Sequence, residues 1–389
     1  LTLHVSGPEP NPVSSEARNR ILMNPDSFPA SPDIAILGAG SWGTGLALLL
    51  EPKANTVTLY GHDPEQVRLI NEEHTNSHYL PGVTLPEGIT ATGDLDAILD
   101  AHLILFVVPS AVTRSVAEAL AERKPNPDAI LLTCSKGIEL GTGKRMSEIV
   151  ADCLPEHAIA VLSGPNHAEE VSRGLASAAV IGSAVPGVAD ALQQLFTTPT
   201  FRSYTSDDMT GMELGAAIKN VFAIASGIAK GLGLGDNATA ALITRGLAEM
   251  IRLGTRLGGR PETFTGLSGV GDLIVTCYSH HSRNFRAGIA IGEGKSVDEA
   301  VGASGMVVEG IPNCQSIHEL AHRTGVRTPL IDAIYAVLYE GKPAALGLQE
   351  LLTRTPVSYT HLTLPTNTVT CGDRGGRGGE KGWGGGGGG

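Results

Sequence analysis

One lysine stands in an unusually apolar stretch of the chain. Lys219 and its neighbour Asn220 lie within residues 213–227, where almost every other side chain is apolar or small. Burying an ammonium group costs free energy, so such a lysine reaches the surface, pairs with an acid, or does chemistry. Desolvation lowers the pKa of a lysine and suits it to proton transfer near neutral pH. On the residues alone, a structural lysine and a catalytic one are about equally well supported.

A glycine turn is the second feature that suggests chemistry. The sequence GAGSWG (38–43) follows the apolar run 34–37 and opens a helix-like stretch at 44–50. In this pattern the first glycine permits a tight turn, the second lets backbone N–H groups approach a pyrophosphate, and the third lets helix and strand pack closely. The spacing predicts a dinucleotide site. Because the chain has 50 glycines, an ordinary turn is the alternative, but the flanking strand and helix favour the nucleotide.

Polar residues also follow two later apolar strands. Lys136 comes after the run 130–133, and the loop SGPNHA (163–168) follows another predicted strand. Open α/β sheets bind their ligands at the carboxyl edge of the strands. A lysine there can polarise a carbonyl group or contact a phosphate, although a lysine at a surface turn is the commoner case. The loop is a second candidate ligand segment, while its histidine, His167, proves little alone.

A further polar cluster follows in the second half of the chain. Arg283 and Asn284 stand at the predicted start of a helix, where backbone N–H groups and a guanidinium can meet one anion. Asp272, shortly before them, could orient a lysine or a substrate hydroxyl. The adjacent His280 and His281 do not favour a metal, because neighbouring residues seldom share an ion and no acidic or cysteine partner has fitting spacing. We therefore expect no metal cofactor.

Alternating strands and helices between residues 33 and 205 must position these groups. The predicted strands are short and largely apolar on both faces, as buried parallel strands are, and span 34–38, 56–60, 103–108, 130–135, 159–162, 178–181 and 202–204. Helix-like segments lie between several of them, at 44–50, 64–73, 112–122, 144–153 and 188–196. The pattern predicts an α/β fold with an N-terminal Rossmann-type doubly wound sheet.

The pattern changes to helices after about residue 206. The segment 208–230 is a long, almost wholly apolar helix-like run, and further helix-like runs occupy 238–257, 284–293, 313–322 and 330–338. A helix that is apolar on all sides is buried on all sides. The sequence therefore predicts an all-α C-terminal domain with its first helix at the centre.

Composition restricts the partners and the compartment. The net charge of −12 argues against nucleic acid or an anionic membrane as the main partner. No run approaches ~18 consecutive apolar residues, so no membrane span is expected. The cysteines, at 134, 153, 277, 314 and 371, form no CxxC pair and no zinc spacing, which indicates reduced thiols. Since the first residues show no secretory signal, we expect a cytoplasmic protein.

Both ends of the chain look foreign to the fold. Residues 1–32 are rich in Pro, Ser and Asn without periodicity and are expected to be a disordered or non-native leader. Residues 357–366, VSYTHLTLPT, resemble the in-frame translation of a common sequencing adapter, and a glycine-dominated run follows. We therefore expect a Rossmann domain at 33–205, a helical domain at 206–355 and an artefactual tail at 356–389. A genuine flexible glycine-rich tail is the alternative.

Together these segments closely resemble the bacterial NAD(P)-dependent sn-glycerol-3-phosphate dehydrogenases. The resemblance runs from about residue 34 to 354, and several blocks in one order are far more specific than the glycine turn alone. Its main blocks are GAGSWGTGLA (38–47), SKGIELGTGKRMSE (135–148), LSGPNHAEEV (162–171), IKNVFAIASGIAKGLGLGDNATAALITRGLAEM (218–250), GLSGVGDLIVTCYSHHSRN (266–284) and MVVEG (306–310). Departures at Gly45, where alanine is usual, and at 215–217, where a second glycine is common, put no functional side chain in doubt.

The resemblance implies interconversion of sn-glycerol 3-phosphate and dihydroxyacetone phosphate with NAD or NADP, which supplies glycerol 3-phosphate for glycerophospholipid synthesis. It also implies a helical domain like that of 6-phosphogluconate dehydrogenase, a homodimer, and Lys219 as the general acid/base. The implied substrate-binding positions are Lys136, Gly164, Asn166, Lys219, Asn220, Asp272, Ser282, Arg283 and Asn284. The implied cofactor-binding positions are Gly38, Gly40, Ser41, Trp42, Gly43, His62, Lys136, Ala168, Arg283, Val307 and Glu309.

Cofactor choice and reaction class leave alternatives. An acidic residue about 20 positions past the glycine turn favours NAD, and Asp63 is such a residue, but His62 comes first and could meet a 2′-phosphate. NADP is slightly favoured, because the bacterial branch often prefers it. One rival is a related two-domain dehydrogenase that acts on another acid, such as a 3-hydroxy acid. The cluster 282–284 and the preceding Thr276 and Cys277 favour a phosphate substrate over this rival. A non-catalytic nucleotide sensor is expected to carry a damaged lysine, but Lys136 and Lys219 are both present.

Overall fold

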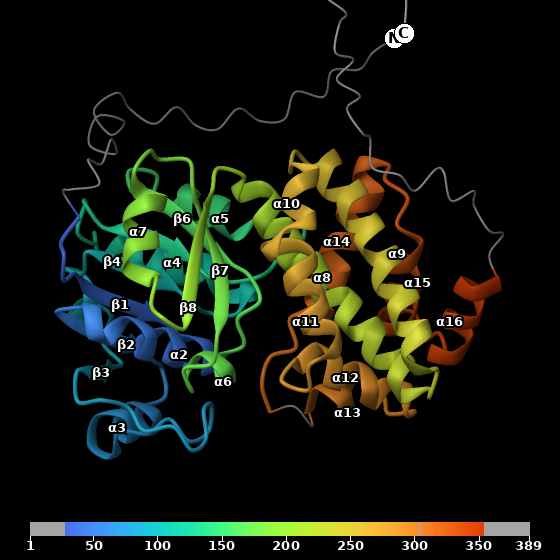
Figure 1. Ribbon diagram of the computed structural model, residues 1–389, viewed down its shortest axis with the longest axis horizontal. Coiled ribbons are helices and arrows are strands. Elements are labelled where there is room, and N and C mark those ends of the chain that lie inside the picture. Colours follow the sequence, from blue (N-terminus) through green and yellow to red (C-terminus); the bar gives the residue numbers. More distant parts are fainter. Residues whose placement is uncertain (1–27, 303–304, 354–389) are drawn as a thin grey trace, which may run out of the picture. The chain divides into compact units, whose positions relative to one another are not determined.

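The structure, a computed structural model, describes residues 28–302 and 305–353 (Figure 1). The expected leader therefore lies largely outside the described residues, and the expected tail at 356–389 lies wholly outside them. The sheet and the helices described below belong to one compact unit, which ends at Arg354. The domain limits of 33–205 and 206–355 stay predictions.

An eight-stranded sheet forms the N-terminal half, in the order β3-β2-β1-β4-β5-β6-β7-β8. The strands span Asp33–Leu37 (β1), Thr56–Tyr60 (β2), Ile89–Thr92 (β3), Leu103–Phe106 (β4), Ile130–Thr133 (β5), Ala158–Ser163 (β6), Ser177–Ser183 (β7) and Phe201–Ser206 (β8). The order reverses between β1 and β4, and sheets of this kind bind their ligands at the carboxyl ends of the strands at this point. The predicted Rossmann-type doubly wound sheet is confirmed.

One pairing differs from the predicted parallel arrangement. β6 and β7 are antiparallel, whereas the other neighbouring strands are parallel. The connection between β6 and β7 holds only the four-residue helix α6 (Ala168–Val171), about 6 Å long, whereas a six-residue strand is about 20 Å long. This helix is too short to return the chain along the sheet, so β7 starts at the same edge and runs the other way. The sequence did not predict β3, whose four residues ITAT are only half apolar.

Helices cover both faces of the sheet (Figure 1). They span Ser41–Leu50 (α2), Pro64–Glu73 (α3), Thr113–Glu122 (α4), Met146–Cys153 (α5) and Val188–Phe196 (α7). Ile34 and Ile36 of β1 belong to an apolar core that includes residues of α2 and α7. Ala35 and Leu37, on the other side of the same strand, belong to a core with residues of α4 and α5. This alternation follows from the two-residue period of a strand, and it holds the strand ends rigidly between two helix layers.

In the described residues after 207, the regular elements are helices. They span Met209–Gly231 (α8), Gly235–Arg256 (α9), Pro261–Thr265 (α10), Asp272–Tyr278 (α11), Arg283–Gly292 (α12), Val297–Gly302 (α13), Gly310–Thr324 (α14), Pro329–Tyr339 (α15) and Ala344–Thr353 (α16), with a π-helical turn at Leu267–Gly271. α8 lies at the centre, with nearly all of its side chains buried (Figure 1). The predicted all-α domain is confirmed, although the sequence did not predict α10, α11, α13 and α16.

The central helix α8 is also the one described helix whose length and composition would allow a membrane span, but its apolar window is completely buried inside the protein. It packs against α12 at backbone distance, since a Cβ on Gly227 would lie 2.8 Å from the Cα of Gly288. Such an approach requires glycine on both helices. The start of α12 is thereby held beside the middle of α8, where Asn284 Nδ2 donates to Asn220 Oδ1 at 3.0 Å.

Candidate active site

The glycine turn between β1 and α2 has the shape of a pyrophosphate cradle. Gly38 has φ +113°, and a Cβ there would lie 2.6 Å from the carbonyl oxygen of Val107. A Cβ on Gly43 would overlap the carbonyl oxygen of Gly38, so the third glycine lets α2 pack on the turn. A Cβ on Gly40 would meet nothing within 4 Å, which leaves this side of the turn open. Since no described side chain caps α2, its first N–H groups are available to an anion.

Other predicted cofactor residues lie around this turn and at the end of β2. Ser41 Oγ donates to the carbonyl oxygen of Tyr79 at 2.7 Å. Nε1 of the half-buried Trp42 is buried and has no hydrogen-bond partner among the described residues. Asp63 accepts a hydrogen bond from a backbone N–H of α3 and caps that helix, whereas His62 is exposed. The Asp63 carboxylate therefore already has a structural role as the N-cap of α3.

The start of α14 contributes a carboxylate to the end of β4. Glu309, the N-cap residue of α14, accepts hydrogen bonds from the backbone N–H and the hydroxyl of Ser110 at 2.9 and 2.5 Å. Burial raises the pKa of the Glu309 carboxyl, although these hydrogen bonds oppose the shift. Arg283 Nη1 donates to the carbonyl oxygen of Val307 at 3.2 Å, and Ala168 is the buried first residue of α6. The structure thus brings Arg283 together with the segment that carries Val307 and Glu309.

Lys219, Lys136 and Asp272 form one charged cluster. The carboxylate of Asp272 accepts from Lys219 Nζ at 2.5 Å and from Lys136 Nζ at 2.9 Å, each through a different oxygen. Lys219 also donates to Thr276 Oγ1 at 2.7 Å, and Lys136 to the carbonyl oxygen of Gly164 at 3.3 Å. Lys219, Asp272 and Thr276 are buried, whereas Lys136 is half-buried. Two lysines from different halves of the chain therefore share one carboxylate.

Burial and charge compete in this cluster. Burial, opposed by Asp272 and reinforced by Lys136, lowers the pKa of Lys219 to about 8. Burial alone would raise the pKa of Asp272, but the ammonium groups of Lys136 and Lys219 outweigh it and hold that pKa below its ordinary value. Lys219 can therefore gain or lose a proton near neutral pH beside a carboxylate that stays charged.

Local structure explains how the cluster is held. Asp272 begins α11 directly after the π-helical turn, and Thr276 lies four residues later on the same face. The Thr276 hydroxyl donates to the backbone carbonyl of Asp272 at 2.6 Å, which orients it to accept from Lys219. Gly164 has φ +146°, and a Cβ there would lie 2.9 Å from the carbonyl oxygen of Ala178. Glycine is thus needed for the turn that presents its carbonyl to the ammonium group.

The predicted phosphate residues begin α12. Ser282 is its N-cap, and its hydroxyl accepts from a backbone N–H of the first turn at 3.2 Å. The amide of Asn284 donates to Asn220 at 3.0 Å and accepts from the backbone N–H of Gly310 at 2.8 Å. Because protein groups already use these side chains, their direct contact with substrate stays a prediction. The half-buried Arg283, whose pKa burial lowers, is the charged group at this helix start.

The loop after β6 holds two polar groups with unused hydrogen-bonding capacity. Asn166 Nδ2 and His167 Nε2 are buried and have no partner among the described residues. Burial lowers the pKa of His167, and the nearby Lys219 lowers it further while Asp272 opposes the shift. Both groups can therefore serve a ligand at the lysine cluster. Asn166 was expected here from the resemblance, whereas His167 carried no sequence signal beyond its place just after a strand.

Sequence reasoning assigned no site role to Ser110 and Asn313, and it used Thr276, together with Cys277, only as support for a phosphate substrate. The contact of Thr276 with the lysine cluster could have been expected from its four-residue spacing to Asp272, and Ser110 could have been found from its place after the carboxyl end of β4. Asn313 donates to the carbonyl oxygen of Lys136 at 3.0 Å. The two residues are 177 positions apart, so no pattern in the neighbouring sequence could have predicted this contact.

Comparison with known proteins gives relatives along nearly the whole described chain. Glycerol-3-phosphate dehydrogenase [NAD(P)+] of Pediococcus pentosaceus is 48% identical over 327 residues, which are 82% of this chain and 97% of that protein. The protein of the same name from Enterococcus faecalis is 47% identical over 338 residues, 85% of this chain and 98% of its own. The crystal structure of glycerol-3-phosphate dehydrogenase from Coxiella burnetii has a TM-score of 0.81 and 40% identity, and covers 84% of this chain and 100% of that one.

Two family models match the two halves of the chain. The N-terminal model of NAD-dependent glycerol-3-phosphate dehydrogenase matches residues 33–189, and the C-terminal model matches residues 208–349. The first match contains the glycine turn and Lys136, and the second contains Lys219, Asp272 and Arg283. The chain therefore belongs to the NAD-dependent glycerol-3-phosphate dehydrogenase family.

Proposed function

We propose that the chain is an NAD(P)-dependent oxidoreductase that interconverts sn-glycerol 3-phosphate and dihydroxyacetone phosphate. The observation that supports it most is the cluster in which Asp272 holds both Lys219 and Lys136. Lys136 follows β5, which is two strands from β1 and its glycine turn along the same edge of the sheet. Relatives that are 48% and 47% identical carry the name glycerol-3-phosphate dehydrogenase [NAD(P)+].

The proposed chemistry follows from where charge develops. The nicotinamide ring, when bound, supplies or accepts the hydride. Reduction of the ketone places negative charge on its oxygen, and Lys219 Nζ stabilises that charge and donates a proton to it. An ammonium group has three N–H donors, and two of those on Lys219 are directed at Asp272 and Thr276, which leaves the third for the substrate oxygen. In the oxidative direction neutral Lys219 accepts the hydroxyl proton.

The remaining residues bind and orient. Arg283, at the N-terminus of α12, would hold the substrate phosphate, because a guanidinium and a helix start both favour an anion. Lys136 would contact the substrate beside Lys219, and Asn166 would use its unpartnered amide on a substrate hydroxyl. The open glycine turn and Trp42 would hold the dinucleotide.

An absorbance assay tests this proposal directly. The purified full chain is expected to oxidise NADH or NADPH with dihydroxyacetone phosphate. With dihydroxyacetone, which lacks the phosphate, kcat/KM should be lower by about a hundredfold or more, since remote binding energy is lost. Turnover of a 3-hydroxy acid instead would favour the rival dehydrogenase, and no absorbance loss with either cofactor would favour a nucleotide sensor.

The two directions of the reaction are expected to respond to pH in opposite ways. Reduction needs protonated Lys219, so its kcat/KM should fall as pH rises through about 8, the lowered pKa of this group. Oxidation needs neutral Lys219, so its kcat/KM should rise through the same pH. Initial rates in both directions across that range measure this. Parallel profiles in the two directions would assign the proton transfer to another group.

Replacing His62 is expected to change cofactor preference. His62→Asp places a carboxylate after β2, where it can bind ribose hydroxyls and repels a 2′-phosphate. The ratio of kcat/KM with NADH to kcat/KM with NADPH should rise by about tenfold or more. Glu87→Gln, at another exposed position before β3, serves as the control and should leave the ratio unchanged. An unchanged ratio in His62→Asp would place the ribose elsewhere.

We further propose a cytoplasmic homodimer that supplies glycerol 3-phosphate for glycerophospholipid synthesis. Family membership supports these assignments, and the net charge of −12 speaks against a nucleic-acid partner. We also propose the domain limits 33–205 and 206–355.

A further inference from the structure

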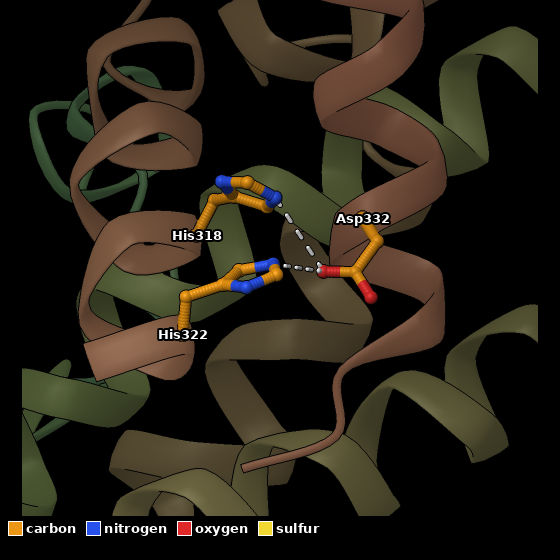
Figure 2. A group of neighbouring side chains, drawn as sticks. All are labelled: His318, His322 and Asp332. Carbon is orange, nitrogen blue, oxygen red and sulfur yellow. Dashed lines mark ion pairs between the residues drawn. The ribbon is translucent and has the colours of Figure 1, made fainter. Parts of the chain in front are cut away.

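Three metal-ligating side chains gather between α14 and α15, and the reaction proposed above makes no use of them. His318 and His322 lie four residues apart on one face of α14, and Asp332 lies on α15 (Figure 2). Nε2 of the two histidines is 3.7 and 3.6 Å from the same atom, Asp332 Oδ1. One potential ligand atom from each residue lies within 4.8 Å of the others. Residues 28–302 and 305–353 contain no second group of this kind.

The spacing suits a bridging cation better than direct hydrogen bonds. Nitrogen and oxygen 3.6 Å apart are beyond hydrogen-bond range. Two ligands of a tetrahedral zinc ion, each about 2.1 Å from the metal, lie about 3.4 Å from one another. The two nitrogen–oxygen separations, 3.7 and 3.6 Å, are therefore close to the separation between two ligands of such an ion, and all three atoms lie within 4.8 Å of one another.

Neighbouring groups orient two of the three ligands. The ring of His318 stacks on Tyr335, with centroids 3.9 Å apart and an angle of 3° between the planes. Thr328 Oγ1 donates to Asp332 Oδ1 at 3.3 Å. Supporting contacts of this kind hold ligands in position and increase metal affinity. The side chain of His322 is 64% exposed and that of His318 is 20% exposed, so water can complete the coordination from the solvent side.

Charge also favours a cation here. Besides Asp332, His318 is faced by Glu340 and Glu319, and all three are acidic. Carboxylates around a group of potential ligands attract a cation to it.

We propose that His318, His322 and Asp332 bind one divalent first-row transition-metal ion, represented by Zn²⁺, and thereby tie α14 to α15. Two imidazoles and one carboxylate suit such ions, whereas Mg²⁺ and Ca²⁺ prefer oxygen ligands. The other end of α14 carries Glu309 and Asn313, which contact the loops after β4 and β5. The metal stabilises the position of this helix and contributes no group to the chemistry of the proposed active site.

Calorimetric titration of the chelator-treated full chain with Zn²⁺ tests the site. We expect one ion bound per chain with a micromolar Kd, and a rise in Tm with added Zn²⁺ but not with Mg²⁺. Co²⁺ as a probe is expected to develop the visible absorption of a histidine-ligated site. These readouts do not depend on enzyme activity, so they fail or succeed separately from the proposed function.

Matched substitutions locate the ion. His322→Ala and Asp332→Asn should each weaken Zn²⁺ binding by at least about tenfold and remove the rise in Tm. His78→Ala, at another exposed histidine, is the control and should bind Zn²⁺ as the unmodified chain does. Circular dichroism checks that each variant is folded. The absence of micromolar Zn²⁺ binding, or an affinity in both ligand variants equal to that of the unmodified chain, would overturn the proposal.

Discussion

Lys219→Ala is expected to lower kcat for dihydroxyacetone phosphate reduction by about a thousandfold or more. The substitution removes the buried ammonium group that hydrogen-bonds Asp272 and Thr276, and with it the proposed proton donor to the ketone oxygen. The ammonium group of Lys136 remains beside Asp272, so the buried carboxylate still has one ion-pair partner. Single-turnover kinetics and NADPH binding by fluorescence measure the effect, and the Kd for the cofactor should change by less than about threefold, because Lys219 is expected to serve the substrate alone.

A lysine on the same helix provides the control. Lys230 stands near the C-terminal end of α8 and is exposed, and Lys230→Ala should keep kcat near that of the unmodified chain. Tm values for both variants separate loss of catalysis from loss of fold. A kcat within tenfold of normal in a folded Lys219→Ala variant would remove Lys219 from the mechanism.

Glu213→Ala is expected to destabilise the fold by about 3–5 kcal/mol, the cost of breaking a buried ion pair. The buried carboxylate of Glu213 on α8 accepts from Arg145 Nη1 at 2.6 Å, and from the backbone N–H and hydroxyl of Ser147 at 2.8 and 2.5 Å. Burial raises the pKa of this carboxyl, although Arg145 and Ser147 oppose the shift. Its removal leaves the two buried donors of Ser147 without their acceptor where α5, at the sheet, meets α8, while Arg145 keeps Glu148 as a partner at 2.9 Å. Tm should fall by about 5–10 °C, as thermal melts can measure.

Two comparisons make this result specific. Glu72→Ala removes an exposed partner of Arg68 on α3 and should change stability by less than about 0.5 kcal/mol. The double variant Arg145→Met with Glu213→Leu replaces both charged side chains by apolar ones of similar volume and should be more stable than Glu213→Ala. Equal Tm values for Glu213→Ala and Glu72→Ala would show that the buried pair adds nothing to stability.

Much of the N-terminal half could be predicted from short segments. The apolar run before GAGSWG and the helix-like residues after it correspond to β1 and α2, and the helices at 64–73 and 188–196 were predicted to the residue. The spacing of the glycines identified the cradle, because a tight turn requires glycine at position 38 and the close approach of the helix requires glycine at position 43. The antiparallel β7 could not be predicted, since its direction depends on how far a four-residue helix carries the chain.

The candidate site divides in the same way. The apolar neighbours of Lys219 indicated its burial, and the strand before Lys136 indicated its place at the sheet edge. Nothing in the sequence showed that both lysines meet one carboxylate, or that Asn220 and Asn284 bond to each other. In the sequence, a metal was considered only at the adjacent His280 and His281, and their spacing argued against it. The group that could hold an ion, His318, His322 and Asp332, joins two helices.

Residue types and local periods therefore established most of the elements that form, though not β3 or several of the shorter helices, and which side chains have chemical capacity. Helix and strand periods and turn glycines act within a few residues, so a short segment carries their full signal. Tertiary packing alone decided which of these side chains meet. Asp272 is 53 residues from Lys219 and 136 from Lys136, and the contact of all three exists because α8, α11 and the loop after β5 pack together. Such packing depends on the shapes of many distant side chains at once, which no short segment encodes.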